Sequence, residues 1–124
     1  TLTGSAAHTI GHFGIVSMHK ETEKDYASLK NSGDVVHERL AELPFWSDYD
    51  ELLQSDVADI KNIGGSTAGA ITAGKFLANF VKYPWIHLDI AGPTYVKTKY
   101  GYRGKGATGI GVRLLYHFIK NRYQ

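Results

Sequence analysis

Three glycines near the C-terminal end of the chain have the spacing of a phosphate-binding loop. Gly104, Gly106 and Gly109 form the pattern G-x-G-x-x-G beside basic residues, just before an amphipathic helical pattern. Bare N–H groups at the start of a helix attract anions, which is why nucleotide-binding loops use this pattern. Here a long loop separates the glycines from the preceding predicted strand, and Lys105 is followed by Gly106 instead of the Ser or Thr of a Walker loop. We therefore predict that this loop binds no nucleotide and that Gly106, Gly109 and Gly111 turn the chain and allow close packing.

Two pairs of residues have a spacing that metal ligands can have. His8 and His12 would share one face of a helix, but Gly11 lies between them and no third ligand is near in the sequence. His87 and Asp89 would share one face of a strand, where the carboxylate could orient a ligating imidazole. We favour a buried, hydrogen-bonded role for both residues at a strand end over metal binding. The chain is therefore predicted to contain no metal ligand.

The bulk composition is that of one ordinary globular domain, which we place at residues 1–124. The chain is 43% hydrophobic and 21% charged, it has no cysteine, and its formal net charge is +2. This small charge disfavours a nucleic-acid partner, because such proteins carry concentrated basic patches. No apolar run approaches the roughly 18 residues of a membrane helix, and the first residues do not resemble a signal peptide. We therefore expect no membrane partner and a cytoplasmic location.

Strand and helix patterns alternate along the chain, which is typical of a layered α/β domain. Strands are predicted at residues 13–18 and 85–91, and helices at 22–43, 47–53, 68–81 and 110–122. The first long helix opens with the form of a capping box, from Thr22 to Asp25, and its apolar stripe runs to Leu43 before Pro44 ends it. The strand at 85–91 alternates cleanly between an apolar face and a face that carries His87 and Asp89.

The end of that strand is the best position for a binding site. In open α/β sheets ligands bind outside the carboxyl ends of the strands, and Ala91 to Thr94 follow this strand directly. The segment Thr1 to Gly4 has the character of the end of another strand. If the two ends are adjacent, they form half of a pocket that contains no obvious acid, base or nucleophile.

Five segments, in the same order, resemble the C-terminal part of the catalytic domain of the leucine aminopeptidase (cytosol aminopeptidase) family. They are TLTG at 1–4, ELPFWSDYDELLQSDVADIKNIGG at 42–65, AGAITAGKFL at 68–77, PWIHLDIAG at 84–92 and KGATGIGVRLL at 105–115. The resemblance implies a three-layer α/β/α sandwich. It also implies a hexameric enzyme that hydrolyses N-terminal residues from peptides with two divalent ions, Zn or Mn.

The resemblance implies substrate-binding roles for six residues and catalytic or metal-binding roles for none. Backbone groups of the first segment would hold the main chain of the peptide, and the other positions would line the pocket for its first side chain. These residues are Thr1, Leu2 and Gly4 in the first group and Ile63, Ala91 and Thr94 in the second. The family signature NTDAEGR, which supplies two acidic metal ligands and an assisting Arg, precedes the TLTG segment and is absent here.

We therefore expect a C-terminal piece of a metallo-aminopeptidase that binds no metal and hydrolyses no peptide alone. The alternative is a non-catalytic binding or assembly module on the same scaffold. Because the family's preceding strands are missing beside TLTG, we also expect an unpaired sheet edge and self-association.

Overall fold

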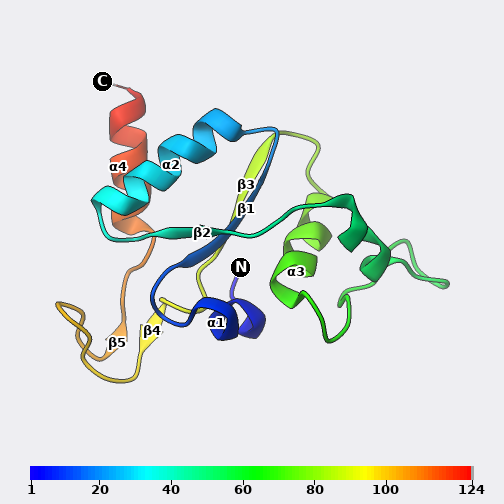
Figure 1. The fold of residues 1–124 in the computed structure, drawn as a ribbon, viewed down its shortest axis with the longest axis horizontal. Helices are drawn as coiled ribbons and strands as arrows, with labels where there is room; N and C mark the ends of the chain where they lie inside the picture. Colours follow the sequence, from blue (N-terminus) through cyan, green and yellow to red (C-terminus); the bar gives the residue numbers. More distant parts are fainter. Residues whose placement is uncertain (124) are drawn as a thin grey trace.

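The computed structural model describes residues 1–123. Its elements, in chain order, are α1 (Gly4–Ile10), β1 (Ile15–Lys20), α2 (Glu23–Val35), β2 (Leu40–Glu42), η1 (Ser47–Leu53), α3 (Gly69–Ala78), β3 (Trp85–Asp89), β4 (Tyr95–Val96), β5 (Gly106–Ala107) and α4 (Val112–Arg122) (Figure 1). No helix within this described part of the chain is both long and apolar enough to cross a membrane.

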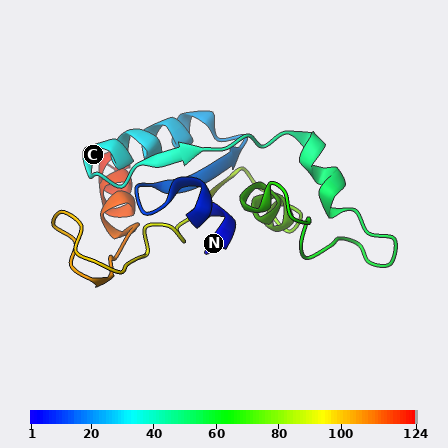
Figure 2. The same cartoon turned by 60° about the horizontal axis from the view of Figure 1, so that its bottom comes forward.

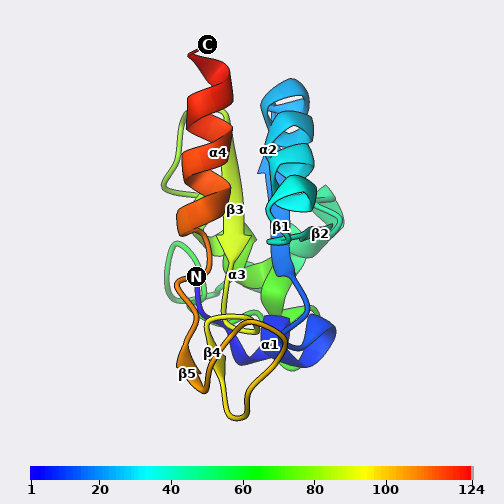
Figure 3. The same cartoon turned by 90° about the vertical axis from the view of Figure 1, so that its left-hand side faces the viewer.

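The main sheet has the strand order β2-β1-β3 and lies between two layers of helices. β1 runs parallel to β2 and antiparallel to β3, and a separate two-stranded sheet pairs β4 with β5. On one face, Val16 and Met18 of β1 pack with α1 and α3. On the other face, Ile15 packs with α2 and α4, which stand side by side (Figure 3). This arrangement confirms the predicted α/β/α fold.

The helix that begins after Thr22 is shorter than predicted, because α2 ends at Val35 and not at residue 43. His37 takes a left-handed backbone conformation with φ 56°, and the N–H of Glu38 donates back to the carbonyl of Gly33 at 2.8 Å. This is the hydrogen bonding of a Schellman motif, which reverses the chain at a helix end. The later apolar residues of the stripe belong to an extended segment, in which Leu40 starts β2.

The start of α2 is correct but its predicted capping box is wrong. Thr22 occupies the N-cap position without a side-chain capping bond. Its hydroxyl instead donates to the carbonyl oxygen of Trp85, at 3.3 Å. The hydroxyl therefore ties α2 to the start of β3.

The remaining predicted elements are present. The short helix expected at 47–53 is the 3-10 helix η1, with the predicted bounds. The helices expected at 68–81 and 110–122 are α3 and α4, and the strands expected at 13–18 and 85–91 are β1 and β3, all with shifted bounds. The apolar face of β3 packs against α2 and α4, as its alternation predicts.

Close packing at a glycine occurs in α3 and not in the G-x-G-x-x-G loop. A Cβ at Gly74 would lie 2.9 Å from the Cε of Met18, so α3 sits directly on β1. In the loop, Gly106, Gly109 and Gly111 all have positive φ, which confirms that they turn the chain. No atom lies within 4 Å of a Cβ built at these positions, so the prediction of close packing there is wrong.

Candidate functional site

The N-terminal segment lies beside the end of β3. The main-chain nitrogen of Thr1 donates to the carbonyl of Leu88 at 2.8 Å, and the carbonyl of Thr1 accepts from the N–H of Ile90 at 3.0 Å. These two bonds have the pattern of a parallel ladder. The two segments that sequence analysis singled out are therefore neighbours in space.

A buried carboxylate holds the next part of this segment. Asp89 is 1% exposed, and its oxygens accept from the N–H of Thr3 at 3.1 Å, the hydroxyl of Thr3 at 2.7 Å and the N–H of Ala91 at 3.2 Å. Burial alone raises the pKa of the Asp89 carboxyl, but hydrogen bonds from Thr3, Thr1 and Ala91 outweigh it and hold that pKa below its ordinary value. The hydroxyl of Thr3 also accepts from the N–H of Ala6 at 3.1 Å, which caps α1.

His87 is the second buried polar residue of this strand face. It is 3% exposed, and its Nε2 lies 3.0 Å from the hydroxyl oxygen of Thr1. Burial, with a smaller effect of the positive charge at the chain's N-terminus, lowers the pKa of His87 to about 4, although Asp89 acts in the opposite direction. The imidazole is therefore neutral at pH 7. The predicted buried, hydrogen-bonded roles of His87 and Asp89 are confirmed, with Thr1 and Thr3 as their partners.

This lowered pKa makes folding stability depend on pH. The unfolded chain takes up a proton at His87 as the pH falls below about 6.5, but the folded chain does so only near pH 4. Since the unfolded state binds more protons between these values, we expect His87 to cost up to about 3 kcal/mol of stability as the pH falls from 6.5 to 4. Urea unfolding at pH 7 and pH 4.5 measures this loss. A His87→Gln variant, which cannot titrate, should lose clearly less, and an equal loss in both proteins would contradict the assignment.

Some main-chain groups of residues 1–4 are hydrogen-bonded and others are free. Thr1 uses both of its groups on β3, and Thr3 donates to Asp89 and accepts from the N–H of Ala7. Within residues 1–123, the N–H and C=O of Leu2 and the N–H of Gly4 have no hydrogen-bond partner. Leu2 is also 66% exposed. The segment therefore presents an acceptor and donors to solvent at a fixed position beside the sheet.

Ala91 and Thr94 follow the end of β3 directly. Ala91 is held by Asp89, and both the N–H and the hydroxyl of Thr94 donate to the carbonyl of Ile90, at 3.1 and 2.6 Å. The structure thus brings Thr1, Leu2, Gly4, Ala91 and Thr94 to the same end of β3.

Ile63 comes from a different part of the chain, the loop between η1 and α3, and is 77% exposed. This loop projects from one end of the molecule, whereas β4 and β5 lie toward the other (Figure 2). Its neighbour Gly64 abuts Thr72 of α3, where a Cβ would lie only 2.6 Å from the Thr72 methyl carbon.

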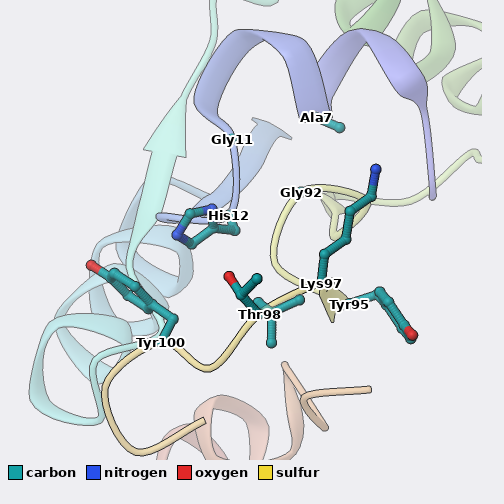
Figure 4. Close-up of a pocket in the computed structure, with 9 residues that line it drawn as sticks. Ala7, Gly11, His12, Gly92, Tyr95, Lys97, Thr98 and Tyr100 are labelled. Atoms are coloured by element: carbon teal, nitrogen blue, oxygen red, sulfur yellow. The ribbon is translucent and has the colours of Figure 1, made fainter. Parts of the chain in front are cut away.

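A cavity of about 320 Å³, lined in part by Gly92 and Tyr95, was not predicted. It lies between α1, the turn at Gly92 and the segment that follows Thr94 (Figure 4). The ring of His12 contacts that of Tyr100 edge to face, with centroids 4.7 Å apart, and Lys97 extends toward α1. Three segments far apart in the sequence build this cavity, so no local pattern could have indicated it.

The described residues do not form a metal centre. Within residues 1–123, no group of three or more His, Asp or Glu side chains is placed to hold a metal ion. His8 bonds the carbonyl of Gly4, and His12 lies beyond the end of α1 at Ile10. The oxygens of Asp89 are already occupied by N–H and O–H donors. This donor set does not fit a two-metal site.

Residues 1–116 match the model of the cytosol aminopeptidase family, catalytic domain. The chain is 47% identical over 121 residues to a probable cytosol aminopeptidase of Geotalea uraniireducens, covering 97% of this chain and 24% of that protein. It is 40% identical over 123 residues to one of Clostridium perfringens, covering 98% and 25%. The chain therefore spans about a quarter of the length of these relatives.

Solved structures show the same fold. The bottromycin maturation enzyme BotP in complex with Mn superposes with a TM-score of 0.92 at 28% identity, over 99% of this chain and 28% of that one. A mutant of tomato leucine aminopeptidase superposes with a TM-score of 0.86 at 32% identity, over 97% and 23%.

Proposed function

The chain belongs to the cytosol aminopeptidase family, and from this premise we propose that it is the C-terminal part of a metal-dependent aminopeptidase that removes N-terminal residues from peptides. The observation that carries the proposal is the free C=O of Leu2 and the free N–H of Gly4, held beside the end of β3 that leads into Ala91 and Thr94. Such a pair of main-chain groups can bind an extended peptide in the manner of an added strand.

The proposed roles differ among the six site residues. The C=O of Leu2 accepts an N–H of the peptide, and the N–H of Gly4 donates to a peptide carbonyl. Thr1 contributes as an anchor, because both of its main-chain groups are bound to β3. Ala91 and Thr94, with Ile63 from the projecting loop, line the pocket for the first side chain of the peptide.

Divalent metal ions belong to the intact enzyme in this proposal. Two such ions, Zn or Mn, would polarise the scissile carbonyl and activate the attacking water. Because residues 1–123 form no such centre, we propose that its ligands come from other parts of the intact protein. The manganese bound to BotP supports a divalent metal. We also propose that the intact enzyme is a cytoplasmic homo-oligomer and that the present chain self-associates.

The pure chain should show no aminopeptidase turnover above the buffer background with Mn²⁺ or Zn²⁺, because residues 1–123 form no metal centre. An aminoacyl chromogenic substrate measures this, with circular dichroism as the check that the chain is folded. The control is the intact gene product, which should turn over the same substrate and lose that activity on chelation.

Metal-dependent turnover by the pure chain would contradict the proposal. An intact protein that lacks both the upstream NTDAEGR signature and any activity would instead favour the non-catalytic module.

A further inference from the structure

We propose that Asp89 and His87 are positioning residues, which act through Thr3 and Thr1 to hold the peptide-binding groups of Leu2 and Gly4 in place. This inference rests on the proposed function and assigns the two buried polar side chains of β3 to it. His87 and Asp89 are 3% and 1% exposed, so neither side chain is open to contact with a peptide.

The ladder of main-chain hydrogen bonds between Thr1 and β3 does not continue to Thr3, whose N–H is bound by Asp89 instead. If the parallel pairing continued, the N–H of Thr3 would donate to the carbonyl of Ile90. That carbonyl instead accepts from the N–H and hydroxyl of Thr94, and the N–H of Thr3 donates to the carboxylate of Asp89. Asp89 therefore substitutes for the lost ladder position and directs the chain into α1.

This substitution explains why Leu2 is free. Alternate residues of an extended segment direct their main-chain groups to opposite sides, so when Thr1 and Thr3 face β3, Leu2 faces away from it. His87 fixes Thr1 on one side of Leu2, and Asp89 fixes Thr3 on the other. Both anchors are almost fully buried, and the ring of His87 lies against α3, where a Cβ built at Gly74 would be 3.6 Å from its Cδ2.

One carboxylate also joins both walls of the site. Asp89 binds Thr3 on the peptide-binding segment and the N–H of Ala91 on the side-chain pocket. A change in its hydrogen bonds therefore alters the distance between the two walls. A merely structural residue at this position would have no such selective effect on substrate binding.

The test is a Thr3→Val variant of the intact protein, which keeps the side-chain shape but removes the hydroxyl that donates to Asp89 and accepts from the N–H of Ala6. Its kcat/KM is measured on two matched substrates, a peptide amide and the ester that replaces the amide N–H with oxygen. Because only the amide offers an N–H to the C=O of Leu2, we expect about a tenfold loss on the amide and less than about threefold on the ester.

Two further variants serve as controls. Thr3→Ser keeps the hydroxyl and should restore the amide rate to within about twofold of the unmodified protein. Thr9→Val removes a hydroxyl of α1 that donates only to the carbonyl of Ser5, and should leave both rates unchanged. If Thr3→Val does not fold, His87→Leu removes the anchor of Thr1, and the same preference for loss on the amide is expected.

Equal losses on the amide and the ester, or no loss on either, would overturn the positioning role alone. An unmodified intact protein that hydrolyses neither substrate in the presence of Mn²⁺ or Zn²⁺ would overturn the proposed function instead.

Discussion

Replacing Glu38 with Ala is expected to lower the free energy of unfolding by about 3–5 kcal/mol. Glu38 is 2% exposed and follows the end of α2. One carboxylate oxygen accepts from the N–H groups of Gly111 and Leu114, at 2.9 and 3.1 Å, and the other accepts from the Nε of Arg113 at 3.1 Å. The carboxylate therefore caps α4 and binds its first cation. Its removal leaves three donors without a partner, and urea unfolding measures the cost.

An exposed ion pair between the same two helices provides the matched control. Arg122 of α4 donates to Asp25 of α2 at 2.6 Å, and both side chains are about half exposed. Asp25→Ala should therefore cost less than about 1 kcal/mol, since solvent screens this pair. Glu38→Gln keeps an acceptor but loses the charge, so its cost in free energy of unfolding should lie between those of Asp25→Ala and Glu38→Ala. A cost below about 1 kcal/mol for Glu38→Ala would show that the buried network is not needed.

Local patterns predicted those elements whose cause is local. The alternation of residues 85–91 predicted both β3 and its apolar face, which packs against α2 and α4, because a strand has a period of two whatever it pairs with. The stripe after Thr22 was misleading for the opposite reason. Apolar residues continue at steps of three and four past Val35 by chance. The helix ends there because the N–H of Glu38 bonds back to the carbonyl of Gly33.

In the candidate site, too, local patterns predicted the local features and missed the contacts between distant segments. The pattern of β3 predicted that His87 and Asp89 are buried and hydrogen-bonded, and this is confirmed. Their partners lie in the first three residues, 86 positions away in the sequence, and no pattern of spacing connects them. The role of Glu38 was missed for this reason too, because a carboxylate at the end of α2 looks like surface charge until α4 covers it.

Gly92→Ala is expected to be the most damaging glycine substitution at the site. A Cβ at this position would lie 1.9 Å from the carbonyl oxygen of Gly11 and 3.7 Å from the Cα of Ala7. These are backbone atoms, so no side-chain rotation can relieve the contact, and the turn after Ala91 must move away from α1. We expect a loss of about 3 kcal/mol in the free energy of unfolding, at the upper end of the cost of overpacking.

This displacement should also separate the wall formed by Ala91 and Thr94 from the segment that carries Leu2 and Gly4. In the intact protein, kcat/KM on a peptide amide should therefore fall more than about tenfold, even at temperatures where the variant remains folded. Gly104→Ala is the matched control, because no atom lies within 4 Å of its Cβ and its φ is not positive. The free energy of unfolding of that variant should stay within about 0.5 kcal/mol of that of the unmodified protein. If both variants behave alike, the contact of Gly92 with Gly11 does not set the position of the pocket wall.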